Sequence, residues 1–155
     1  MSLVEKYKKL DKLINQNKED EINDVFRDIL SETFELINKK IENNEKLDVN
    51  NPEEAAAIRA MFEYMLELWD EGAIDEAKEV GYDMAYLVND DRLKEMFSMF
   101  VLGMLEGLSL DKFFEKYVNT ERVYKDVFFA DFDDKIDELV IKHKAQFKKE
   151  FSKDA

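Results

Sequence analysis

The sequence predicts an all-α fold, with six to seven helices arranged as antiparallel helical hairpins in either a bundle or a short solenoid. Three observations carry this prediction. Apolar residues recur at intervals of three and four along most of the chain, which is the spacing of one helix face. One Pro and four Gly among 155 residues leave few positions at which a helix would break. No stretch alternates strictly between apolar and polar residues over the length of a strand.

Two helices are expected in the first 46 residues. The first extends from Leu3 to about Gln16, and Asn17 is suited to end it because Asn tolerates a positive φ better than most residues. The second extends from about Glu19 to Asn44 and has the clearest amphipathic pattern in the chain. Its apolar positions advance by threes and fours: Ile22, Val25, Phe26, Ile29, Leu30, Thr33, Phe34, Ile37 and Ile41.

A third helix is predicted after the short linker at 47–50. Asn51 is suited to the N-cap and Pro52 to the first helical position, while Glu54 has the position that closes a capping box. The apolar pattern then continues until Gly72, which is expected to end the helix.

The second half of the chain contains four further helical patterns and one ambiguous segment. Helices are predicted at about 74–89 and 91–106, the latter ending at Gly107. A short helix capped by Ser109 follows, and a last helix covers about 133–151. The aromatic segment between these two is either helical or irregular.

The length favours one domain, 1–155, because a chain of this size buries roughly 70% of its unfolded surface. Within it we distinguish three parts: an N-terminal helical hairpin at 1–46, central helical hairpins at 51–118, and the aromatic segment with the last helix at 119–155. Charge is distributed unevenly over these parts. Residues 1–18 and 142–155 each have a net charge of +3. The residues between them have a net charge of −20, which makes the whole chain −14.

The composition argues against several classes of function. A net charge of −14 lacks the basic footprint of a nucleic-acid binder. The absence of Cys excludes a disulfide framework, a thiol nucleophile and a thiolate metal site. The only His, His143, lies between two Lys and is interpreted as a surface residue near a helix C-terminus, not a catalytic base. We therefore expect no cofactor.

The chain is expected to be cytoplasmic and to have no membrane partner. Charged residues occur from Glu5 onward, which does not fit an apolar signal-peptide segment. No run of 18 apolar residues exists that would form a transmembrane helix.

Two helix–turn–helix junctions share a pattern, at 68–77 and 104–111. Their Glu-Gly pairs lie 35 residues apart, close to the period of about 34 residues in tetratricopeptide repeats. The first junction resembles a tetratricopeptide turn, with Ala77 five residues after Gly72. The resemblance implies stacked helical hairpins. The sequence departs from the pattern at Gly81, where a large apolar residue is expected, and at Lys112, which replaces the packing Ala.

Carboxylates suggest one enzymatic alternative. The stretch 79–88 resembles the second motif of all-α nucleotide pyrophosphohydrolases, which bind Mg²⁺ before hydrolysing a triphosphate. The resemblance implies a metal site made of Glu63, Glu67, Glu79 and Asp83. Both acid pairs are spaced four residues apart, whereas the family motifs space them three apart, and acids four apart on a helix pair are easily explained as a solvated face.

Met and aromatic residues suggest a binding surface. Six of the seven Met lie between positions 61 and 104, and aromatic residues are dense between 113 and 132. Flexible Met and exposed aromatic side chains suit adaptable contacts with a partner, although a buried core explains them too. The candidate partner-binding residues are Met96, Met99, Phe100, Phe113, Phe114, Tyr117, Phe128 and Phe129.

These observations favour a non-enzymatic helical protein–protein interaction module, an adaptor or chaperone-like protein that receives a helix or extended segment of a protein or peptide partner. In type and size it resembles the specialised chaperones of bacterial secretion and flagellar export. A homo-oligomer is compatible with the same surface. The Mg²⁺-dependent pyrophosphohydrolase and an acidic protein that mimics DNA are the alternatives.

Overall fold

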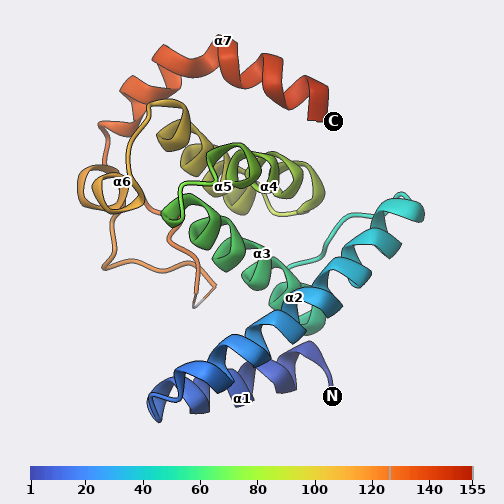
Figure 1. Cartoon of the computed structure of the whole chain (residues 1–155). Helices are drawn as coiled ribbons and strands as arrows, with labels where there is room; N and C mark the ends of the chain where they lie inside the picture. Colours follow the sequence, from blue (N-terminus) through green and yellow to red (C-terminus); the bar gives the residue numbers. More distant parts are fainter. Residues whose placement is uncertain (126, 155) are drawn as a thin grey trace. The chain divides into compact units, whose positions relative to one another are not determined.

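The structure is a computed structural model that describes residues 1–125 and 127–154, without the side chains of the last two of these. The described residues form seven helices and no strand (Figure 1), which confirms the all-α prediction. The helices are α1 (Leu3–Asn15), α2 (Glu19–Glu42), α3 (Pro52–Asp70), α4 (Ile74–Leu87), α5 (Asp91–Leu105), α6 (Leu110–Tyr117) and α7 (Ile136–Asp154).

The chain divides into two compact units, Met1–Met61 and Phe62–Ala155. This division falls inside α3, whereas the sequence placed the end of the N-terminal hairpin at the linker. The expectation of a single domain stays a prediction, and each unit is described by itself.

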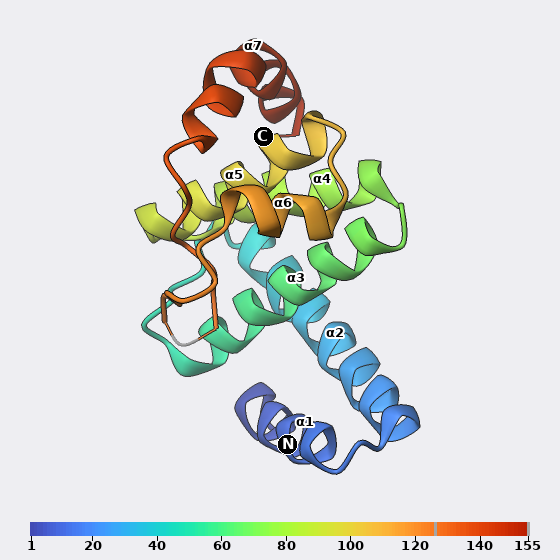
Figure 2. The same ribbon diagram turned by 90° about the vertical axis from the view of Figure 1, so that its left-hand side faces the viewer.

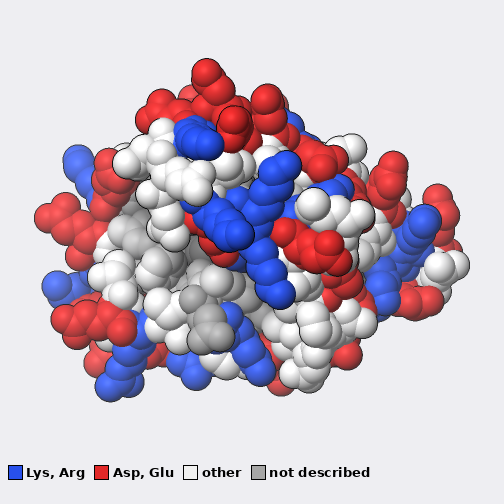
Figure 3. Space-filling model, turned by 90° about the horizontal axis from the view of Figure 1, so that it is seen from below, with Lys and Arg blue, Asp and Glu red and all other residues white. Residues whose placement is uncertain are grey.

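The first unit is built on the hairpin of α1 and α2, which pack against each other. The hydroxyl of Ser2 caps α1 by accepting from the N–H of Glu5, and Asn17 ends the turn with φ of 54°, as its position predicts. Charged side chains pair across this unit: Lys6 binds Asp28 at 3.1 Å and Glu32 at 2.7 Å. Figure 3 shows such mixing of Lys and Arg with Asp and Glu on one face.

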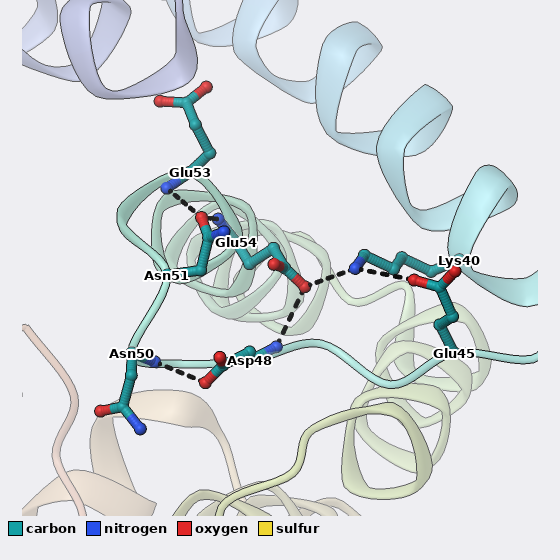
Figure 4. A network of polar contacts seen from close by, with 7 residues as sticks. All are labelled: Lys40, Glu45, Asp48, Asn50, Asn51, Glu53 and Glu54. Atoms are coloured by element: carbon teal, nitrogen blue, oxygen red, sulfur yellow. Dashed lines mark hydrogen bonds and ion pairs between the residues drawn. The ribbon is translucent and has the colours of Figure 1, made fainter.

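The start of α3 is fixed by a polar network (Figure 4). Asn51 caps the helix, accepting from the N–H groups of Glu53 and Glu54 at 3.0 and 3.3 Å. The carboxylate of Glu54 does not turn back to Asn51, whose N–H donates to the Asp48 carbonyl. Glu54 accepts instead from the N–H of Asp48 and binds Lys40 at 2.8 Å, so it ties the linker to α2.

Glu53 joins the start of α3 to the start of α1. Its two carboxylate oxygens accept from the N–H groups of Leu3 and Val4 at 2.8 and 3.0 Å. These donors lie in the first turn of α1, where a helix has no internal acceptors for them. A negative charge at that point is also favoured by the helix dipole. The N-terminus of α1 is therefore capped by a side chain from α3.

The centre of the second unit is the α4–α5 hairpin. Gly72 and Gly107 adopt φ of 88° and 80° at the ends of α3 and α5, as predicted. Gly81 allows α4 to approach α5 closely, because a Cβ atom there would overlap Cγ2 of Val101. The Gly that departs from the tetratricopeptide pattern is thus required by the packing of this pair.

The aromatic segment after α6 is irregular, which settles the alternative left open by the sequence. Two isolated bridges close its described part, Val118 with Phe132 and Tyr124 with Phe128. The Tyr124 hydroxyl donates to Asp90, the N-cap residue of α5, at 2.7 Å. No helix of the described residues has the length and apolarity needed to cross a membrane.

Candidate interaction site

A surface pocket of about 240 Å³ lies between α5 and α7 in the second unit. Its wall is almost entirely carbon, even where polar residues contribute to it. Figures 1 and 2 show α7 lying across α4 and α5. The residues of α7, the last helix of the chain, form one wall of the pocket, and residues of α5 form the other. The lining residues are Ser98, Met99, Leu102, Val140, Lys144, Phe147 and Lys148.

The sequence of α5 explains why this helix forms one wall of the pocket. Its buried positions point in nearly every direction, so one face packs on α4 while another remains for α7. Met99 and Leu102 lie three residues apart and therefore share that second face. The side chain of Ser98 is small, and its hydroxyl donates to the Lys94 carbonyl in its own helix at 2.8 Å. The hydroxyl proton of Ser98 therefore needs no acceptor from a molecule in the pocket.

Near its N-terminal half, α7 is held by Glu106 at the C-cap of α5. The Glu106 carboxylate accepts from Lys142 at 2.6 Å and lies 3.4 Å from Nε2 of His143. The hydrogen bond from Lys142 lowers the pKa of Glu106 below its usual value, against the smaller effect of burial. His143 is thus a largely covered contact residue within α7, which corrects its interpretation as a surface residue surrounded by cations.

Near the C-terminal end, α7 is held by α4. The Glu150 carboxylate accepts from Lys78 at 3.0 Å and from the Tyr82 hydroxyl at 3.1 Å. Burial raises the pKa of Glu150, but hydrogen bonds from Gln146 and Lys78 outweigh it, and the pKa is lowered overall. The Phe147 ring packs edge-to-face on Tyr82, with centroids 5.2 Å apart.

The pocket lies alongside these two attachments. Val140 is short and β-branched, so it does not extend far toward α5. Lys144 and Lys148 contribute their carbon chains to the wall while their ends stay in solvent. No large apolar side chain among the described residues fills the space that remains.

One side of α7 borders the pocket and is exposed. Ile141, Lys144 and Lys148 follow one another at intervals of three and four and therefore share this side. The side chain of Ile141 is 80% exposed, which is unusual for an Ile in a helix packed on a core. Among the described side chains, neither lysine has an ion-pair partner. We call these three residues the α7 flank.

The structure brings one predicted binding residue, Met99, to this site. Phe114 and Phe129 are half-buried and contact each other edge-to-face at 5.4 Å. The other five are buried in the second unit, most of them in its aromatic core: Met96, Phe100, Phe113, Tyr117 and Phe128. Val140, Ile141 and the two flank lysines were not predicted as site residues, although an Ile among charged residues of an amphipathic helix is a visible signal.

The carboxylates of the hydrolase alternative are not assembled into a metal site. Glu79 is exposed, while Glu63, Glu67 and Asp83 are half-buried on α3 and α4. Among the described residues, no group of three or more His, Cys, Asp and Glu side chains lies close enough to hold a metal ion. The alternative therefore gains no support from the arrangement of these four acids.

Neither a family model, nor a curated protein, nor a solved structure matches this chain.

Proposed function

We propose that this protein is a non-enzymatic interaction module, of adaptor or chaperone-like type, which holds an apolar anchor side chain of a partner protein in the pocket between α5 and α7. The observation that carries the proposal is an unfilled apolar pocket beside Ile141, the most exposed large apolar residue in the described part of the chain.

The volume of the pocket favours a side chain over a cofactor. Sites for drug-sized ligands and cofactors usually occupy roughly 300–1,000 Å³. A cavity of about 150 Å³ already accepts benzene. The pocket, at about 240 Å³, therefore fits one large apolar side chain and is small for a nucleotide or a flavin.

The surroundings of the pocket also have the anatomy of a protein interface. Binding energy at such interfaces concentrates in one or a few apolar anchors within a pocket, surrounded by a polar rim. Met99 adds a flexible wall that adapts to different anchors. Lys144 and Lys148 supply the polar rim, and Ile141 extends the apolar contact beyond the pocket.

The test is a selection of displayed random peptides on the full-length chain, followed by affinity measurements on purified peptides. Val140→Trp places an indole in the pocket, and Glu138→Trp places the same side chain on the other side of α7 as the matched control. We expect selected peptides to bind the wild type and Glu138→Trp equally and to lose at least about tenfold in affinity for Val140→Trp.

Thermal unfolding of both variants shows that they are folded before affinities are compared. Peptides that bind both tryptophan variants equally would place the interaction elsewhere. A selection that enriches no peptide would contradict the proposed function as a whole.

A further inference from the structure

We infer that the partner segment is an acidic amphipathic helix, which seats one apolar residue in the α5–α7 pocket and pairs carboxylates with Lys144 and Lys148 of the α7 flank. This inference rests on the proposed function and adds the chemistry of the partner. It is carried by charge complementarity and by the geometry of the flank.

The charge of the flank is opposite to that of the chain. The protein has 37 Asp and Glu against 23 Lys and Arg, yet residues 142–155 contain five Lys and only two acids. One of those acids, Glu150, is turned to Lys78 and Tyr82. Lys142 forms an ion pair with Glu106, the C-cap residue of α5.

Lys144 and Lys148 remain as cations at the rim of an apolar pocket. Cations beside an apolar surface favour a partner that brings carboxylates, and they disfavour a basic one through like-charge repulsion. At an ionic strength of about 0.15 M, charges beyond roughly 8 Å are largely screened. The negative charge of the remaining protein therefore opposes a local contact at this rim only weakly.

The spacing of the flank fits a helix. Ile141, Lys144 and Lys148 rise along α7 by about 1.5 Å per residue, so they span roughly two turns. A helix laid beside α7 repeats its side chains with the same interval. It therefore brings acids four residues apart to the two lysines while an apolar residue between them enters the pocket. This is the helix-in-groove mode of recognition, with anchors at helical spacing.

The inference is tested with the peptides obtained from the selection described above. We expect them to be enriched in Asp and Glu at intervals of three and four around one large apolar residue. They should also gain helical circular dichroism when they bind. Lys148→Glu is expected to weaken binding about fivefold or more. Lys149→Glu makes the same change of charge on the neighbouring position, turned away from the pocket, and should change affinity less than twofold.

The decisive experiment exchanges the charges of the peptide and of the α7 flank. Peptides whose acids are replaced by Lys should bind the wild type poorly and recover affinity for the double variant Lys144→Glu/Lys148→Glu. Selected peptides that are neutral or basic, that respond equally to Lys148→Glu and Lys149→Glu, or that stay non-helical when bound would overturn the inference. Sensitivity to Val140→Trp would then leave the proposed function standing. Loss of that sensitivity as well would overturn both.

Discussion

The two sides of α5 differ in how they are covered. On the α4 side, Gly81 lets the backbones approach until Val101 fills the space beside it. On the α7 side, Lys142 attaches α7 to Glu106 at the C-cap of α5, Phe147 and Glu150 attach it to α4, and a pocket remains between α5 and α7. A helix that is held by a few specific contacts need not pack closely along its whole length.

This difference separates stability from binding within one unit. Close-packed contacts give the dispersion and burial on which folding depends, and they offer nothing to a partner. The looser contact leaves apolar surface that is only partly removed from water, and a partner gains free energy by covering it. We therefore expect substitutions on the α4 side to change the free energy of unfolding, whereas substitutions on the α7 side change it less and change binding more.

The largest expected effect comes from enlarging a side chain on the closed side. Gly81→Leu places atoms where Val101 already lies, and overpacking of this kind costs about 3 kcal/mol of unfolding free energy. Ser98→Leu is the matched enlargement on the pocket side, where there is room, and should cost less than about 1 kcal/mol. Denaturant unfolding of the two variants measures both values. Equal losses would show that the two sides of α5 are packed alike.

A smaller loss is expected where α7 contributes most to its own attachment. Phe147→Ala removes the ring that packs on Tyr82 and Phe151, at a cost of about 2 kcal/mol because the ring is only partly buried. Ile141→Ala truncates an exposed side chain on the same helix and should change stability by less than about 0.5 kcal/mol. Thermal unfolding followed by circular dichroism compares the pair. A comparable loss in both would mean that the α7 flank is buried in the folded protein.

The helices were predictable because their signals are local. The spacing of apolar residues gave the elements, and Asn17, Gly72 and Gly107 stand in the backbone conformations that their positions indicated. The last helix begins at Ile136 and not at 133, since the acids before it belong to the turn. Glu54 was assigned the wrong contact because the competing partner, Lys40, lies on another helix.

The candidate site was predictable only at Met99, and the reason is physical. A pocket between helices depends on which side chains meet and on the lengths they have, and this information is spread over residues about 40 positions apart. The aromatic residues between 113 and 132 were visible in the sequence, but periodicity does not show whether an aromatic ring is buried. Most of them form the core around Phe100 and Phe113.

The smallest expected effect is a dependence of the α7 attachment on pH. The pKa of Glu150 is lowered in the folded protein, so the folded state binds its proton less readily than the unfolded chain does. Such a carboxylate stabilises the fold fully above its ordinary pKa of 4.5, and this contribution is lost as the pH falls through the folded value. The pKa of Glu106, which accepts a hydrogen bond from Lys142 of α7, is also lowered, so its contribution depends on pH in the same direction.

Glu150→Gln is therefore expected to lower the free energy of unfolding by about 1 kcal/mol at pH 7 and by less at pH 3, where part or all of this contribution is lost. Glu138→Gln changes an exposed carboxylate on the same helix and should leave the difference between the two pH values as it is in the wild type. Urea unfolding of the three proteins at both pH values measures these differences. If Glu150→Gln has the same cost at pH 3 as at pH 7, the charge of Glu150 does not hold α7 to α4. The attachment of this end of α7 to α4 would then depend on the aromatic contacts of Phe147 and Phe151 with Tyr82.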